Sequence, residues 1–84
     1  MYEIVFSKSA KKELFKLPNS VIEKIDKAIL SLAENPKPMG CIKLESFKDL
    51  YRIRIGNYRV IYRIENDVLI VEIVKIADRK EIYK

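Results

Sequence analysis

The spacing of the hydrophobic positions changes along the chain, and each spacing predicts a different element. Residues 2–6 form a short run of β-branched and aromatic side chains, which favours a β-strand. Residues 8–17 place apolar side chains at helical spacing, and Ser7 stands where its side chain can cap the first turn. The buried stripe of this helix is predicted to be Ala10, Leu14 and Leu17.

A second helix is predicted over residues 20–34. Ser20 and Glu23 have the spacing of a capping box, in which each side chain accepts a hydrogen bond from the other residue's backbone N–H. The helix should end before Asn35-Pro36, because the residue preceding a proline disfavours the helical conformation. The predicted apolar face contains Val21, Ile22, Ile25, Ala28, Ile29 and Leu32. The two helices are therefore expected to form a hairpin with one apolar side.

The second half of the chain is predicted to be mostly strand. Alternating apolar and polar residues flank Gly56-Asn57, which is a two-residue turn signal. The expected strands are residues 42–44 (weak), 50–55, 58–64 and 68–76, with a second turn at 65–67. Asp78 can cap a short terminal helix that carries Glu81 at its third position.

This order of elements predicts the α+β class. We expect one domain, residues 1–84, with two layers. An N-terminal strand and a helical hairpin pack on one face of a mainly antiparallel sheet of about four strands, and a short helical tail follows. No apolar run approaches the length of about 20 residues that a membrane span requires. Without a signal-peptide pattern at the start, the chain is expected to be cytoplasmic, with no membrane partner.

The two-residue turn also predicts which side chains share a face of the sheet. It pairs Ile55 with Tyr58 and Arg54 with Arg59, and side chains alternate between the faces along each strand. One face should then carry Tyr51, Ile53, Ile55, Tyr58, Val60 and Tyr62, which are apolar enough to receive the helices. The other should be an open face carrying Arg52, Arg54, Arg59 and Arg63.

The charges point to a polyanionic partner. There are 17 basic and 12 acidic residues, for a net charge of +5, and all five arginines lie after residue 51. Two like charges facing each other across strands, as Arg54 and Arg59 would, destabilise a sheet by about 0.2–1 kcal/mol. A fold that keeps such a pair is expected to hold it for an anion such as phosphate. The alternative is a solvated face with salt bridges to Glu72, which a two-residue Asn66-Asp67 turn would place opposite Ile61.

The absence of histidine removes histidine acid–base pairs and histidine metal ligands, and the single Cys41 excludes an intramolecular disulfide and a multi-cysteine zinc site. We expect no metal and no cofactor. Arg79 and Tyr83 are four residues apart, which places them on one side of a helix. Tyr83 either joins the arginines or packs its ring on the sheet edge.

Several stretches carry a family resemblance. These are the strand–turn–strand segment 50–62, the closing segment 76–83, Asn35-Pro36 with Lys43-Leu44, and the apolar positions of the first helix. In this order they resemble the RelE/ParE superfamily of toxin–antitoxin toxins, specifically its RelE-type ribonuclease branch.

The resemblance implies a ribosome-dependent, metal-independent endoribonuclease that cleaves mRNA through attack of the 2′-hydroxyl on the adjacent phosphate. Carried over by position, the implied catalytic residues are Arg54, Arg59, Arg79 and Tyr83, and the implied RNA-binding residues are Arg52, Arg54 and Arg63. Many relatives have a histidine where this chain has Asp78, and some have lysines in place of Arg52 and Arg54. Because an arginine cannot give up its proton, Tyr83 is the candidate for proton transfer.

The resemblance also implies a cognate antitoxin. An acidic, partly disordered antitoxin segment would cover the arginines and the apolar Leu50, Ile61, Ile70 and Val74 beside them. Two alternatives stay open: a ParE-type toxin of the same fold that poisons gyrase, and a non-catalytic module that binds RNA or protein.

Overall fold

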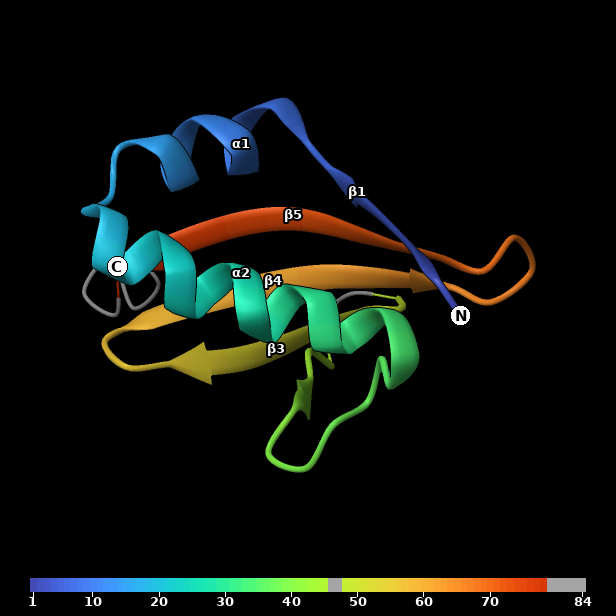
Figure 1. Cartoon of the computed structure of the whole chain (residues 1–84). Helices are drawn as coiled ribbons and strands as arrows, with labels where there is room; N and C mark the ends of the chain where they lie inside the picture. Colours follow the sequence, from blue (N-terminus) through green and yellow to red (C-terminus); the bar gives the residue numbers. More distant parts are fainter. Residues whose placement is uncertain (46–47, 79–84) are drawn as a thin grey trace.

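A computed structural model describes residues 1–45 and 48–78 and places two helices against a five-stranded sheet (Figure 1). Along the chain the elements are β1 (Glu3–Phe6), α1 (Lys8–Phe15), α2 (Asn19–Glu34), β2 (Ile42–Lys43), β3 (Leu50–Ile55), β4 (Tyr58–Glu65) and β5 (Ile70–Asp78). The predicted α+β class with a helical hairpin on one side of the sheet is confirmed. No helix within the described residues is long and apolar enough to cross a membrane.

The strands lie in the order β1-β5-β4-β3-β2. β1 pairs with β5 in parallel, and the other neighbours are antiparallel. The sheet has one strand more than the expected number of about four, because β1 joins the same sheet at one edge and the two-residue β2 forms the other. The chain thus starts at one edge, passes through both helices and returns to build the sheet from the opposite edge.

The helix boundaries follow the predicted caps at α1 but not at α2. Ser7 caps α1 as expected, its Oγ accepting a hydrogen bond of 3.1 Å from the Ala10 N–H, although the helix ends at Phe15. The predicted capping box of α2 is wrong: Pro18 is the N-cap, and no side chain makes a capping bond there. The Pro18 carbonyl already accepts from the N–H groups of Val21 and Ile22, so Ser20 lies inside the first turn.

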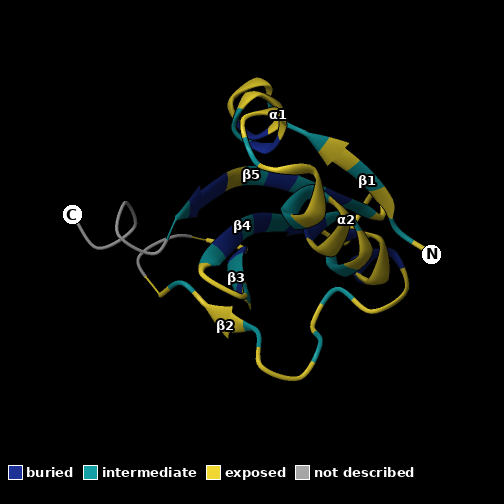
Figure 2. Cartoon of the chain, turned by 60° about the vertical axis from the view of Figure 1, so that its left-hand side comes forward, coloured by how far each residue is buried: buried dark blue, intermediate teal, exposed yellow. Residues whose placement is uncertain are grey.

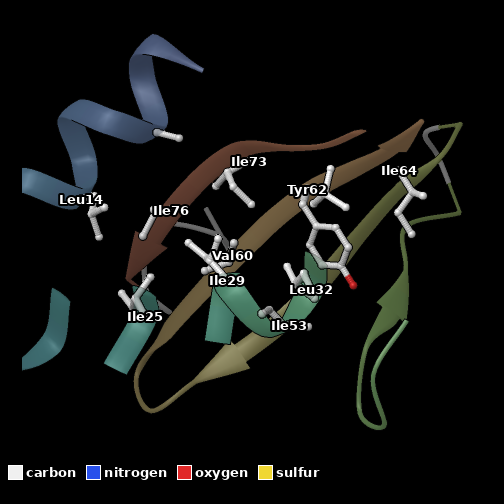
Figure 3. Packing of buried hydrophobic residues seen from close by; sticks show 12 residues of the cluster. Leu14, Ile25, Ile29, Leu32, Ile53, Val60, Tyr62, Ile64, Ile73 and Ile76 are labelled. Atoms are coloured by element: carbon white, nitrogen blue, oxygen red, sulfur yellow. The ribbon is translucent and has the colours of Figure 1, made fainter. Parts of the chain in front are cut away.

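The core lies between α2 and the face of the sheet predicted to receive it (Figure 3). Ile25, Ile29 and Leu32 project from α2 towards the sheet, where Val60 and Tyr62 are fully buried. The buried core residues described by the structure include Ala10, Leu14, Ile53, Ile64, Val71, Ile73 and Ile76 as well. The apolar face is therefore the covered one, and the arginines lie on the other side of the sheet.

Tyr62 fastens the segment before β2 to the sheet. Its hydroxyl donates a hydrogen bond of 2.7 Å to the Pro36 carbonyl, and its ring stacks on Tyr51 with centroids 5.9 Å apart. Burial, with a smaller contribution from the neighbouring Cys41 thiol, raises the pKa of Tyr62 well above its ordinary value. The Lys37 amino group lies 5.4 Å from the centre of the Tyr51 ring. These contacts set where β2 runs beside β3.

The turn between β4 and β5 differs from the prediction. Glu65 pairs with Ile70, so four residues, 66–69, form the turn, and Leu69 adopts a positive φ of 55°. The expected strand from residue 68 therefore starts two residues later, at Ile70. A bulge at Ile61/Tyr62 shifts the register again further along the strands. The longer turn alone places Glu72 opposite Arg63, not opposite Ile61 as predicted, because the bulge lies beyond this pair.

Beyond the end of β1, the side chain of Glu13 takes over the hydrogen bonding at the edge of β5. β1 ends at Phe6, opposite Ile73, and the chain then turns into α1. Glu13 of α1 accepts a hydrogen bond of 3.2 Å from the Ile76 backbone N–H through one carboxylate oxygen. Its other oxygen lies 3.6 Å from the Lys75 amino group. Glu13 thereby connects α1 to β5, and Figure 1 shows this helix beside that strand.

Candidate functional site

The side of the sheet away from α2 carries four arginines from two adjacent strands. Arg54 of β3 lies directly opposite Arg59 of β4, as predicted. Arg52 is opposite Ile61, and Arg63 is opposite Leu50, so all four arginines share this side of the sheet. We call it the arginine face, and it consists of Arg52, Arg54, Arg59 and Arg63. A single hairpin, β3 with β4, therefore supplies all four guanidiniums of this face.

Exposure is uneven across the arginine face, which corrects the expectation of an open surface. Arg54 is exposed and Arg52 is half-buried, but only 1% of Arg59 is accessible. Arg59 lies on the central strand β4, between Arg54 on one side and the small Ala77 on the other. A buried guanidinium has few conformations and keeps its charge. Arg59 is therefore a fixed positive charge, whereas Arg54 can move to meet a ligand.

A groove lies beside Arg52 and Arg54 of β3. It has a volume of about 290 Å³ and is lined by Met39, Gly40, Ile42, Arg52, Ile53 and Arg54. The groove arises because β2 is only two residues long and its pairing with β3 stops at Arg52, opposite Ile42. Met39 and Ile42 are both exposed apolar residues. The lining therefore combines apolar side chains with two guanidiniums, and this composition suits a nucleotide with its base and phosphate.

Glu72 neutralises one of the four arginines. Its carboxylate accepts a hydrogen bond of 2.7 Å from Arg63 Nη1, and both side chains are partly exposed. This ion pair follows from the corrected register, which sets Glu72 opposite Arg63. At Arg63 the structure thus supports the alternative to an anion site, which was a solvated face with salt bridges to Glu72. The structure accordingly gives less support to the predicted RNA-binding role of Arg63 than to the roles of Arg52 and Arg54.

Asp78 does not face the arginines. It ends β5 opposite Tyr58, and Tyr58 belongs to the side of the sheet that the helices cover. Its neighbour Ala77 is the residue that lies opposite Arg59. The Asp78 position therefore belongs to the opposite side of the sheet from the arginine face. Two other predicted catalytic residues, Arg79 and Tyr83, and the predicted terminal helix with Glu81, lie outside the described residues.

Sequence reasoning missed the apolar wall of the groove. Met39 and Ile42 carry no chemistry of their own, and the weak strand signal around Ile42 gave no register with β3. The pairing of Ile42 with Arg52 would have revealed Ile42, since residues opposite each other share a face, but it does not place Met39, which precedes β2. No group of three or more cysteine, aspartate or glutamate side chains placed to hold a metal ion occurs in the described part of the chain.

Comparisons with known proteins agree with this architecture. The sequence matches the family described as the ParE toxin of the type II toxin–antitoxin system, parDE, over residues 4–83. A relative from Methanocaldococcus jannaschii that carries the name RelE1 is 34% identical, with 99% of this chain and 96% of the relative covered. The mRNA interferase toxin RelE of Escherichia coli is 28% identical, with 98% of this chain and 90% of that protein covered. A chain of the archaeal RelE–RelB complex from Pyrococcus horikoshii has a TM-score of 0.83 and 32% identity, with 93% of this chain and 94% of that chain covered.

Proposed function

Because the chain belongs to the RelE/ParE family of toxins of type II toxin–antitoxin systems, we propose that it is a ribosome-dependent endoribonuclease that cleaves mRNA. The observation that carries the proposal is the opposition of Arg54 and Arg59 on the side of the sheet that the helices leave uncovered. Two like charges that face each other across strands destabilise a sheet, and a bound anion would offset this cost. A relative is named an mRNA interferase, which supports the RNA phosphodiester as that anion.

The proposed reaction begins when the 2′-oxygen of one nucleotide attacks the adjacent phosphorus. The bond to the 5′-oxygen of the next nucleotide breaks, which leaves a 2′,3′-cyclic phosphate and a free 5′-hydroxyl. Negative charge builds up on the non-bridging oxygens in the transition state, and the fixed guanidinium of Arg59 stabilises it together with Arg54 and Arg79. Tyr83 relays the proton of the 2′-hydroxyl to the departing 5′-oxygen, or it orients the 2′-hydroxyl while that proton is transferred.

Arg52 has a positioning role in this proposal. It lies beside Arg54 in the wall of the groove, where it can hold a neighbouring phosphate while the base contacts the apolar side. Phosphate contacts of this kind fix the register of the strand, and correct alignment of the attacking oxygen contributes much of the rate. The chain offers no histidine for acid–base catalysis, which fits an enzyme whose substrate the ribosome arranges.

We also propose a cognate antitoxin as partner, since the similar structure from Pyrococcus horikoshii is a complex of RelE with RelB. An acidic antitoxin segment would compete with RNA for the arginine face. Ile61 lies between Arg59 and Arg63 along β4 and is half-buried, as are Ile70 and Val74 of β5, and these side chains would provide apolar contacts for such a segment.

The proposed activity is tested by incubating the protein with translating ribosomes and mapping the 5′ ends of the messenger. We expect new ends within codons that depend on ribosomes, and none on the same naked RNA. The matched family is described as ParE, so a gyrase supercoiling assay is run in parallel. Inhibition of gyrase without mRNA cleavage would replace the nuclease by a ParE-type toxin. A protein that affects neither target would be a non-catalytic binding module.

A further inference from the structure

The outward side of α1 forms a second basic surface, on a different part of the molecule from the arginine face. Ala10 and Leu14 are the buried residues of this helix, and the opposite side is exposed to solvent (Figure 2). We call this side the lysine face, and it consists of Lys8, Lys11, Lys12, Phe15 and Lys16, all of them exposed.

The lysine face is not balanced by acidic residues. α1 has no acidic residue in its first turn, and its one acidic side chain, Glu13, is directed to Ile76 and Lys75 of β5. Within the described part of the chain, no ion pair involves a lysine of α1. Lysines three and four positions apart on a helix repel each other, and a lysine at the helix N-terminus opposes the helix dipole. The helix therefore carries an electrostatic cost that a bound polyanion would remove.

An aromatic ring lies among these lysines. Phe15 is 68% exposed, although it belongs to a small protein whose other aromatic side chains in the described residues are at least partly covered. Lys11 and Lys12 precede it by four and three positions, so both are its direct neighbours on the helix surface. Proteins that bind single-stranded nucleic acid combine these two components, a ring on which a base stacks and cations that contact the flanking phosphates.

The composition of the lysine face fits a nucleic acid better than a protein. The buried centre of a protein interface is apolar and depleted in lysine. Here one apolar residue is surrounded by four lysines, which leaves little apolar area for a protein partner to bury. A single strand needs only one ring per base and charges beside it.

We propose that the lysine face is a non-catalytic binding site for single-stranded RNA, with a base stacked on Phe15 and the neighbouring phosphates contacted by Lys8, Lys11, Lys12 and Lys16. Between α1 and the arginine face lies Lys75, which is opposite Ile61 and has its amino group 3.6 Å from a carboxylate oxygen of Glu13. The site does not depend on cleavage and extends RNA contact beyond the arginine face.

The test measures the fluorescence anisotropy of a labelled single strand of 2′-O-methyl RNA, which lacks the attacking hydroxyl and so cannot be cleaved. Titrations over a series of salt concentrations use the full chain carrying Arg52→Gln and Arg54→Gln, which weakens binding at the arginine face. In this background Phe15→Ala should reduce affinity on the order of tenfold, the effect of losing one stacked base. Phe15→Trp should retain the affinity of the background protein.

The lysines are tested by the slope of log affinity against log salt. Replacing Lys8, Lys11 and Lys12 with Gln removes three phosphate contacts, and each contributes about 0.7 to the slope for a single strand, so the slope should fall by about 2. Lys24→Gln with Lys27→Gln, together with Leu30→Ala, are the matched controls, because these residues are exposed on α2. The controls should change affinity little. Thermal unfolding of every variant checks that the fold is kept.

Two results would overturn the proposal. If Phe15→Ala and the lysine variant bind like the background protein, or if the α2 controls lose as much, the lysine face is only a solvated surface. If RNA binding is unchanged but Phe15→Ala weakens the antitoxin complex, the face is a protein-docking surface. Neither result bears on mRNA cleavage, which is measured separately with ribosomes, so failure of this site is distinguishable from failure of the proposed activity.

Discussion

Arg54 and Arg59 lie directly opposite each other on β3 and β4, yet Arg54 is exposed and Arg59 is almost completely buried. The pair thus combines one guanidinium that is fixed in the sheet with one that can reach a ligand. Preorganised charge stabilises a transition state more effectively than charge that must first be positioned. The burial of Arg59 therefore adds to the argument for a catalytic site, and the exposure of Arg54 makes it the better target for mutation.

Arg54→Gln should lower the single-turnover rate of mRNA cleavage on stalled ribosomes by about 10²–10³-fold, as expected for loss of one electrostatic donor. Arg63→Gln is the matched control, since Arg63 lies on the same face but is already paired with Glu72. It should cleave within a few-fold of wild type. Equal rates for both variants at saturating protein would remove Arg54 from the catalytic set.

Tyr83→Phe tests proton transfer and removes only a hydroxyl group. If Tyr83 carries or orients the proton of the 2′-hydroxyl, the rate under saturation should fall by about 10²–10⁴-fold. Arg52→Gln is the comparison, because a positioning residue should weaken RNA binding while saturating protein restores most of the rate. Wild-type cleavage by the Tyr83→Phe variant would assign the proton step to another group.

Affinity for the cognate antitoxin should decrease as salt increases, since charge pairs on the arginine face are screened at high ionic strength. Isothermal titration at several salt concentrations measures this dependence. Arg52→Gln with Arg54→Gln should flatten it, whereas Arg63→Gln should not. An affinity that is constant from low to high salt would show that apolar contacts, not the arginines, hold the antitoxin.

Local signals in the sequence were sufficient to predict the register that builds the site. Gly56-Asn57 is a two-residue turn, and such a turn leaves a single way to pair the strands beside it. The β4–β5 connection could not be predicted in this way. Asn66-Asp67 reads as a tight turn, but the observed turn also takes in Val68 and Leu69, which the sequence pattern assigns to the strand. A bulge then shifts the register once more, and no residue type marks it.

Burial of the site residues was less predictable than their placement. Alternation along a strand tells which face a side chain occupies, but it does not tell how much of that face is covered, so the burial of Arg59 was missed. The capping box at Ser20 failed for a similar reason. The spacing of Ser20 and Glu23 indicated a capping box, but Pro18 is the N-cap of α2 and no side chain makes a capping bond there.

Glu13→Ala should destabilise the protein, because it leaves the N–H of the buried Ile76 without its partner at the edge of β5. A buried donor that loses its acceptor costs about 1–3 kcal/mol. Chemical denaturation gives the free energy of unfolding, with Glu23→Ala on the exposed side of α2 as the control. A loss no larger than in the control would mean that the Glu13 contact with Ile76 contributes little to stability.

Tyr62→Phe should destabilise the fold and also change how its stability depends on pH. Removing the hydroxyl breaks the hydrogen bond to the Pro36 carbonyl and should cost about 1–2 kcal/mol. Burial raises the pKa of Tyr62 above that of an unfolded tyrosine, so the folded state keeps the proton to a higher pH than the unfolded state. Above a pH of about 10, where tyrosine in an unfolded chain ionises, the stability of the wild type should therefore fall. Tyr62→Phe should lose this alkaline dependence, and Tyr51→Phe, which keeps the ring stack, should retain it. The free energy of unfolding measured by denaturation at neutral and alkaline pH checks both effects, and an equally steep alkaline decline in Tyr62→Phe would assign it to another group.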